Sequence, residues 1–381
     1  MTSASLGPPG RGHEPALDGL RGIAALVVVF RHVFNQMTVP PGVRHALAQS
    51  PVALLLNAQG AVQLFFVLSG WVLAASLARS GERAPWLQFY VKRVFRIHPP
   101  YVAAVLVALA TTLVPPAPRP FDVPLAQQAM AAAPDAASLA AHLAFPGTAG
   151  GLLPVGWTLR IEMIFSFLLP LLALAASGGR ALALLAASAA LAFAADADVA
   201  RYGFDFALGA VLQRERRRVG AWLRALPAAG RALVVVAGLV LVCAPLLFWP
   251  RLVRGILIAG WLPHEILVMG LGCGLLVAAA VDVPAFGRAL SRPACLFLGR
   301  ISYPLYLLHS TFLVLLAPRF LDGTQRGSFG LLLAVTLVSI VASVPFHAWI
   351  ERPSIALGNR VCRALARRTG TRAIESEAAL P

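Results

Sequence analysis

An arginine and a histidine in the first apolar run are the first residues whose types and spacing could do chemistry. Arg21 and His32 stand eleven residues apart. In an α-helix that spacing is three turns plus about 20°, so both lie on one face, about 16 Å apart. Asp18 is in reach to pair with Arg21. An imidazole with a pKa near 6.5 exchanges protons near neutrality, so His32 is of a residue type that could do chemistry. A snorkelling arginine and a helix-end histidine would produce the same pattern without chemistry.

Two further polar groups lie in or beside the next apolar runs. Ser69 and Gly70 follow a run of bulky side chains, and a Ser-Gly pair either leaves room for a ligand or lets two helices approach closely. Arg93 and Arg96 are three residues apart and share a helix face at the edge of an apolar run. Guanidinium groups bind phosphates well, but the same pattern also marks the end of a membrane span. Spacing alone leaves both interpretations open.

A carboxylate and a tyrosine-histidine group lie in later apolar runs. Glu162 places a carboxylate within an apolar span, where it either pairs with an arginine or has a functional role. Tyr306 and His309 share a helix face by their three-residue spacing. His347 and Glu351 are four residues apart and precede an Arg-Pro pair, which predicts an end cap on the last helix.

The composition indicates which kind of structure must position these groups. Of the 381 residues, 59% are hydrophobic and only 13% are charged, whereas a soluble domain carries about 25% charged side chains. The same composition excludes a disordered chain, a disulfide scaffold and a nucleic-acid-binding protein, despite a formal net charge of +16. The four cysteines lack CxxC spacing, so we predict no metal site. The sequence predicts an integral membrane protein.

Apolar runs long enough to cross a bilayer recur along the chain. We predict an all-α, polytopic membrane bundle of about ten transmembrane helices. The runs are 17–35, 54–78, 97–114, 152–176, 181–195, 199–213, 231–249, 255–281, 294–317 and 329–350. The sixth run is short and contains Asp205. Pro263, His264 and Glu265 interrupt the eighth, so we expect a broken helix or two segments there.

The distribution of arginines predicts the topology, because loops rich in arginine stay cytoplasmic. Clusters such as 214–218 and 360–372 fall on the inner side if the N-terminus is inside. An even number of spans with both termini in the cytoplasm fits this bias, and we expect no cleaved signal peptide. We predict a cytoplasmic tail over 1–16, a membrane domain over 17–355 and a basic cytoplasmic tail over 356–381.

Five of these motifs occur together, in an order that is typical of one family. They are Leu17 to Ala25 with His32, Phe65 to Gly70, Arg93 to Tyr101, Trp157 to Glu162, and Ser302 to His309. In this combination the chain resembles the membrane-bound acyltransferase-3 family over roughly residues 16 to 355. The most specific piece is the arginine and histidine separated by ten residues in the first helix. The family includes O-antigen, exopolysaccharide and Nod-factor acetylases.

The resemblance implies a multi-pass enzyme of the bacterial cytoplasmic (inner) membrane. Such an enzyme moves an acyl group, usually acetyl, from a cytoplasmic acyl-CoA to a hydroxyl of a cell-surface or exported glycan such as lipopolysaccharide. By this resemblance His32 stands at the catalytic histidine, Arg21 at its paired arginine and Glu162 at the acidic residue of a fourth-helix motif. Many members have an acidic residue where this chain has Gln63, which puts a proton-handling role there in doubt. We expect no hydrolase-like domain after residue 355.

The resemblance also implies which residues meet the donor. We expect His32 to act as general base or transient acyl carrier. We expect the donor site and the acyl route to include Arg21, Arg93, Arg96, Ser69, Gly70, Tyr303 and His309. The expected partners are acyl-CoA, most often acetyl-CoA, as donor substrate, a glycan or lipid-linked glycan acceptor, and membrane lipid. We expect no metal and no nucleic acid.

Two other classes of protein would use the same buried charges. In a transporter or flippase, arginine, glutamate and histidine side chains form a path for an anionic substrate or for protons, without covalent chemistry. A scaffold subunit of a polysaccharide export machine would tolerate substitution of His32 and Arg21. Cleavage of a labelled thioester in the presence of an acceptor separates the enzyme from both.

Overall fold

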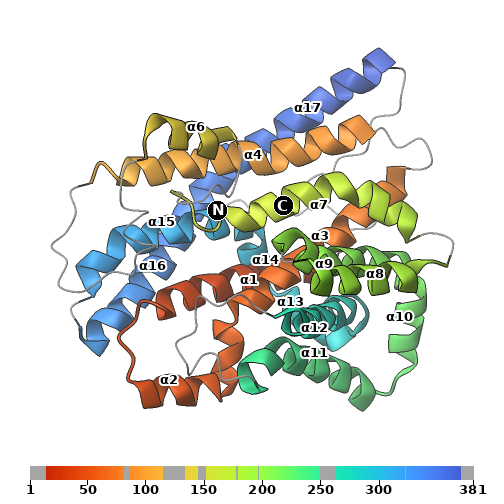
Figure 1. Cartoon of the computed structure of the whole chain (residues 1–381), viewed down its shortest axis with the longest axis horizontal. Helices are drawn as coiled ribbons and strands as arrows, with labels where there is room; N and C mark the ends of the chain where they lie inside the picture. Colours follow the sequence, from red (N-terminus) through yellow and green to blue (C-terminus); the bar gives the residue numbers. More distant parts are fainter. Residues whose placement is uncertain are drawn as a thin grey trace, which may run out of the picture.

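The computed structural model describes residues 14–80, 86–114, 134–144, 152–176, 179–195, 197–248, 262–321 and 323–369. Within these ranges every regular element is a helix, as predicted (Figure 1). The helices are α1 (Pro15–Phe34), α2 (Pro41–Ala48), η1 (Pro51–Leu56), α3 (Ala58–Ser80), α4 (Trp86–Thr111), α6 (Ala136–Ala144), α7 (Gly156–Ala175), α8 (Ala181–Ala194), α9 (Asp198–Arg214), α10 (Arg216–Ala225), α11 (Ala228–Phe248), α12 (Pro263–Asp282), α13 (Pro284–Leu290), α14 (Pro293–Arg300), α15 (Ser302–Phe320), α16 (Gln325–Phe346), η2 (His347–Glu351) and α17 (Arg352–Thr369).

Proline marks the first turn of several helices, because its missing N–H would have no partner there in any case. It begins α1 at Pro15 and α12 at Pro263. The Glu265 Oε2 atom accepts a hydrogen bond from the backbone N–H of Leu262 at 2.8 Å, which caps the start of α12. The interruption that we predicted in the eighth run is therefore the beginning of a helix. The part of that run before residue 262 lies outside the described residues.

The described residues contain six helices that are long and apolar enough to cross a membrane. They are α3, α4, α7, α11, α12 and one continuous helix from α16 into α17 (Gln325–Arg368). The pair of α14 and α15 would make a seventh, although the two are bent by 68°. The chain is thus a multi-pass membrane protein. The count of ten spans stays a prediction, since α1 carries three charged side chains and α8 has only 14 residues. The cytoplasmic position of both termini also stays a prediction.

The run predicted over 294–317 is divided between α14 and α15 by this bend. The Ser302 hydroxyl donates to the carbonyl of Gly299 at 2.8 Å, so this backbone oxygen next to the bend has a hydrogen-bond partner. Gly299 also lies against the first turns of α1, where an added Cβ would stand 2.4 Å from the Asp18 carbonyl oxygen. This close contact places α14 beside Arg21 and lets α15 turn away into the bundle.

Two other predicted boundaries are wrong. α4 begins at Trp86 rather than at 97 and includes Pro99 and Pro100 in its interior; internal prolines are tolerated in membrane helices, where neighbouring groups satisfy the freed carbonyls. The last helix does not end at an end cap. His347 Nδ1 lies 2.7 Å from Glu351 Oε2 within a π-helical turn, and the helix continues as α17.

α17 lies along α4 (Figure 1). The Ser354 hydroxyl donates to the carbonyl of Phe95, and the Cys362 thiol donates to that of Gln88 at 3.3 Å. The domain boundary that we predicted at 355 therefore falls inside a helix that packs on the membrane bundle. Most of the predicted N-terminal tail and the last residues of the C-terminal tail, 370–381, lie outside the described residues.

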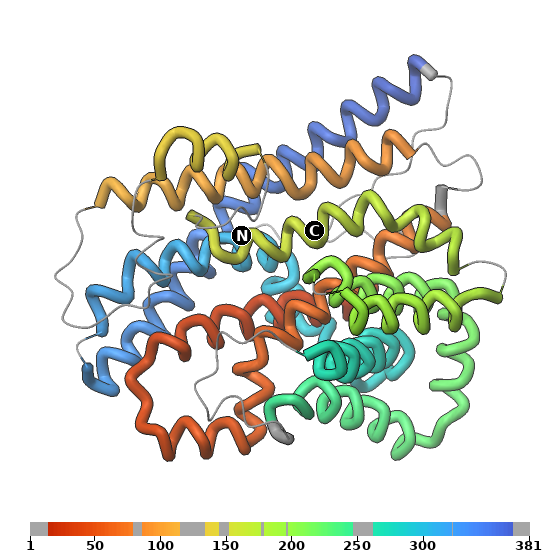
Figure 2. Tube along the Cα trace, in the orientation of Figure 1, coloured from red at the N-terminus to blue at the C-terminus, as the bar shows by residue number. Residues whose placement is uncertain are grey.

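α1 and α3 occupy the centre of the bundle, with α15 and α16 on one side and α11 and α12 on the other (Figure 2). Four fully buried side chains contribute to the core between α1, α3, α4 and α15: Val67, Leu68, Tyr101 and Leu307. α3 also packs tightly on α9. A Cβ on Gly70 would lie 2.3 Å from the Phe206 carbonyl oxygen, and one on Gly209 would lie 2.1 Å from that of Val67.

Candidate active site

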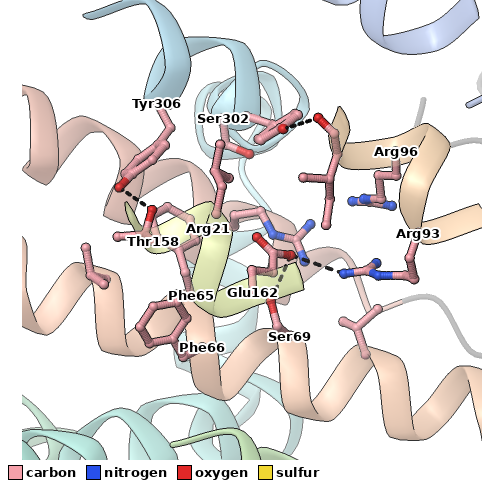
Figure 3. Close-up of a pocket in the computed structure, with 15 residues that line it drawn as sticks. Arg21, Phe65, Phe66, Ser69, Arg93, Arg96, Thr158, Glu162, Ser302 and Tyr306 are labelled. Atoms are coloured by element: carbon pink, nitrogen blue, oxygen red, sulfur yellow. Dashed lines mark hydrogen bonds and ion pairs between the residues drawn. The ribbon is translucent and has the colours of Figure 1, made fainter. Parts of the chain in front are cut away.

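A cavity with a mixed lining of polar and apolar side chains lies where α1, α3, α4, α7 and α15 meet (Figure 3). Its volume is about 80 Å³, room for a few water molecules. It is lined by Arg21, Val62, Phe65, Phe66, Ser69, Val72, Arg93, Arg96, Ile97, Thr158, Leu159, Glu162, Ser302, Tyr303 and Tyr306. Five helices distant in sequence thus contribute polar side chains to one space in an apolar bundle.

An ion pair between Arg93 and Glu162 crosses the cavity. Arg93 Nη2 donates to Glu162 Oε1 at 3.1 Å, and the Ser69 hydroxyl donates to the same oxygen at 3.4 Å. Arg93 Nε also donates to the Ser166 hydroxyl at 3.4 Å. The Arg93 side chain is only 8% exposed and that of Glu162 is 24% exposed. Removing either partner would leave a poorly hydrated charge, so the pair holds α4 and α7 together.

Arg21 and Arg96 add two further guanidinium groups to the cavity. Figure 3 shows Arg21, Glu162 and Arg93 pointing toward one another. Arg21 Nη1 also donates to Asp18 Oδ1 at 3.3 Å, which confirms the predicted pair. The lining holds three arginines and one carboxylate, and Asp18 supplies a second carboxylate to Arg21 from outside the lining. The positive charge that remains suits an anionic group such as a phosphate.

Tyrosines of α15 line another part of the cavity. The Tyr303 hydroxyl donates to the carbonyl of Ile97 at 2.8 Å and ties α15 to α4. The Tyr306 hydroxyl lies 2.7 Å from Thr158 Oγ1, which itself donates to the carbonyl of Val155 at 2.9 Å. These two contacts connect α15 with both helices that form the ion pair.

Two histidines form a hydrogen-bonded pair beyond Tyr306. His32 Nδ1 lies 2.8 Å from His309 Nε2, and the two rings are stacked with centroids 5.0 Å apart. The centroid of the Tyr306 ring lies 5.9 Å from that of His309. His309 is fully buried. The cavity and the imidazole of His32 are thus connected through Tyr306 and His309.

The hydrogen-bond partners assign the protons of this pair. His309 Nδ1 lies 2.8 Å from the Tyr306 carbonyl oxygen and 3.2 Å from that of Leu305. A carbonyl only accepts, so Nδ1 of His309 carries the proton and its Nε2 accepts. His32 Nδ1 must then donate to His309 Nε2. In the neutral pair, His32 Nε2 holds a lone pair and is able to act as a base or nucleophile.

The structure brings most of the predicted site residues together. The cavity is lined by Arg21, Ser69, Arg93, Arg96, Glu162 and Tyr303, whereas His32 and His309 lie beyond it as a pair. Gly70 contacts α9 instead, in agreement with the packing interpretation of the Ser-Gly motif. Glu162 binds Arg93 and Ser69, not His32. Gln63 is fully buried, and its side-chain nitrogen and oxygen have no hydrogen-bond partner among the described residues.

The sequence did not indicate that His309 is the partner of His32. The two histidines are 277 residues apart, and spacing relates only residues of one helix. Thr158 was likewise missed, because a threonine in an apolar helix is common and only its contact with Tyr306 distinguishes it. The sequence feature that could have indicated this pair is the presence of one histidine in each of two apolar runs.

The fold and this site define a multi-pass helical membrane protein with a basic internal cavity next to a histidine pair. Residues 14–348 match a family model that is described as an acyltransferase domain. The chain therefore belongs to the acyltransferase-3 family, as the motifs predicted, and is a membrane acyltransferase. No curated protein and no solved structure gives a significant match to it.

Proposed function

We propose that the protein transfers an acyl group, most often acetyl, from a cytoplasmic acyl-CoA to a hydroxyl of a cell-surface or exported glycan, in the inner membrane of a bacterium. The observation that carries this proposal is the His32–His309 pair, which leaves a lone pair on His32 Nε2 and is connected through Tyr306 to a cavity lined by three arginines. The family supplies the reaction class. The donor, the acceptor and the role of His32 are our inference.

The cavity arginines support acyl-CoA as the donor. Coenzyme A carries several phosphate groups, and guanidinium groups bind phosphates with paired hydrogen bonds. Arg21 and His32 are separated by about 16 Å along α1. A donor whose phosphates meet Arg21, Arg93 and Arg96 would have to extend its long thiol arm past Tyr306 to bring the thioester to His32. The arginines thus select the donor, and the histidine acts on its acyl end.

Two routes of acyl transfer fit the proton positions of the pair. As general base, His32 Nε2 takes the proton of the acceptor hydroxyl while its oxygen attacks the thioester carbonyl; the C–S bond then breaks, and the proton passes to the departing thiolate. As acyl carrier, His32 Nε2 attacks the carbonyl itself, the C–S bond breaks and the thiolate leaves; the acceptor hydroxyl oxygen then attacks the acyl-imidazole, the N–acyl bond breaks, and the hydroxyl proton passes to the thiolate. His309 accepts a hydrogen bond from His32 Nδ1 in both routes.

The test replaces His32 with alanine. The purified protein in nanodiscs receives acetyl-CoA labelled in the acetyl group and the surface polysaccharide of a strain that lacks the gene. We expect the wild type to move label into the polysaccharide and His32→Ala to lose this activity at equal protein levels. A fully active His32→Ala variant would overturn the proposal.

The same assay separates the alternative class. A transporter would carry glycan across a proteoliposome membrane while the thioester stays intact. Flux of labelled polysaccharide without release of free coenzyme A would favour that class. Pre-steady-state quenching adds a third readout, because acid-labile label on the protein would indicate the acyl-carrier route rather than the general-base route.

A further inference from the structure

A second pair of arginines lies at the far end of α1, next to His32. Arg31 precedes the histidine in the chain, and Arg44 comes from α2. The Arg44 guanidinium lies over the Phe34 ring at 4.8 Å from its centroid, and its Nη2 donates to the Met37 carbonyl at 3.3 Å. The positive charges of Arg31 and Arg44 are close enough to repel each other. The fold therefore holds two like charges together at the end of α1 that carries His32.

These charges lack a counter-charge in the described part of the chain. Neither Arg31 nor Arg44 forms an ion pair there, whereas Arg21 and Arg93 each have a carboxylate partner. The Nη1 atom of Arg31 is shielded from solvent and has no hydrogen-bond partner among the described residues. Leaving such a group unpaired is costly, so a ligand that pairs with it would gain affinity.

Asn35 adds an acceptor to the same surface. Its Oδ1 atom is also shielded and without a hydrogen-bond partner in the described part of the molecule. Asn35 directly follows the last residue of α1 and keeps a helical backbone conformation, four residues after Arg31 and three after His32, so these side chains are neighbours on the helix surface. The surface thus offers the Arg31 guanidinium and the Asn35 amide oxygen within one helical turn of His32, with Arg44 stacked on Phe34 two residues further along the chain. An anionic oxygen group beside a hydroxyl would complement it.

We propose that Arg31 and Arg44 bind a carboxylate or phosphate group of the acyl acceptor, with Asn35 accepting from a neighbouring sugar hydroxyl. This inference rests on the proposed function. The acceptor would then be an acidic glycan, for example one with a uronic acid, or a glycan attached to a phosphate-bearing lipid. The bound anion would fix the sugar so that its free hydroxyl faces His32 Nε2.

The position of the pair assigns it to the acceptor rather than to the donor. Arg31 lies ten residues beyond Arg21, about 15 Å further along α1. The phosphates of the donor are matched by the cavity arginines at the other end of that helix. If the N-terminus is cytoplasmic, the end of α1 with Arg31 faces the outer side, where an exported glycan arrives.

The test compares matched acceptors. The polysaccharide of the deletion strain is used in its native form, after chemical reduction of its carboxyl groups, and after removal of its phosphates with hydrofluoric acid. We expect the wild type to prefer the native form over one of the two neutralised forms by about tenfold or more in kcat/KM, as expected for a charge-assisted hydrogen bond. If kcat/KM falls after reduction of the carboxyl groups, the bound anion is a uronic acid. If kcat/KM falls after removal of the phosphates, the bound anion is a phosphate.

Variants link this preference to the arginines. We expect Arg31→Gln and Arg44→Gln to lose the preference, mainly through a higher KM for the native form, and Arg31→Lys to retain part of it. Arg201→Gln is the matched control, because it removes an arginine of α9 that pairs with Asp198, and it should keep the preference. Size-exclusion profiles and thermal unfolding of all variants check that they are folded.

Three results would overturn the inference. In the first, the wild type acylates native and neutralised acceptors equally well, which would leave the proposed function intact. In the second, the arginine variants keep the wild-type preference. In the third, the effect of Arg31→Gln is present in nanodiscs with phosphatidylglycerol and absent in pure phosphatidylcholine, which would assign the anion to a lipid headgroup. A wild type that acylates none of the acceptors would overturn the proposed function as well.

Discussion

Replacing His309 with alanine tests the histidine pair, because it removes the partner of His32 and leaves the reacting ring in place. In the structure His309 Nε2 accepts from His32 Nδ1 at 2.8 Å. That bond holds the proton on Nδ1 and the lone pair on Nε2. Without it the His32 ring can rotate and can carry its proton on either nitrogen. We expect His309→Ala to lower activity and not to abolish it.

The magnitude follows from this one hydrogen bond. When His32 carries a positive charge in the transition state, the bond to His309 is charge assisted, and such bonds contribute about 1.5 to 3 kcal/mol. Because 1.36 kcal/mol corresponds to a factor of ten in rate, kcat/KM should fall about 10- to 150-fold. His32→Ala removes the reacting nitrogen itself, and its loss should approach about 10⁴-fold, the upper range for general acid–base catalysis.

The assay is label transfer from acetyl-CoA to the polysaccharide at several donor and acceptor concentrations. His309→Gln should recover part of the loss, because a glutamine amide oxygen can accept from His32 Nδ1. Thermal unfolding corrects for the void that alanine leaves at a fully buried position. The reasoning would be refuted by an unchanged kcat/KM in His309→Ala, or by a loss equal to that of His32→Ala, which would make His309 the reacting group.

Two further predictions concern the helices that build the cavity. Glu162→Gln leaves the buried guanidinium of Arg93 without its carboxylate and should destabilise the protein by about 3 kcal/mol; thermal unfolding should show partial recovery in the double variant Glu162→Gln/Arg93→Gln, and equal midpoints for the single and double variants would contradict the pairing. Gly70→Ala places a Cβ 2.3 Å from the Phe206 carbonyl oxygen and should cost about 1 to 3 kcal/mol by forcing α3 and α9 apart. Gly42→Ala is the control, because a Cβ added there would have no neighbouring group within 4 Å. A Gly70→Ala variant as stable as this control would refute the packing role.

Local spacing predicted what lies within one helix. The pair of Asp18 with Arg21 was predicted correctly, because residues three apart on a helix are neighbours whatever surrounds them. The all-α membrane fold was predictable for a similar reason, since only helices satisfy every backbone polar group within a continuous apolar segment. The bend at Ile301 was not predictable, because it depends on how Gly299 packs against α1.

The motif order also predicted the family, and the match over residues 14–348 confirms it. The wrong boundaries share one cause. Pro99 and Pro100 indicate a helix start, and the pair of His347 and Glu351 indicates a helix end. Both helices nevertheless continue through these positions, where α4 and α17 contact each other. Local signals of helix ends are weak where another helix satisfies the backbone and covers the surface.

By itself, the sequence determined the class of protein, the membrane-embedded helices and the polar residues available on each of them, because composition and helical periodicity are local properties. Only the tertiary structure decided that Glu162 binds Arg93, that His32 meets His309 and that Gly70 faces α9. These pairs join residues on different helices, and their choice depends on helix rotation and crossing angle. Those are set by side-chain packing over the whole bundle, which no local pattern specifies.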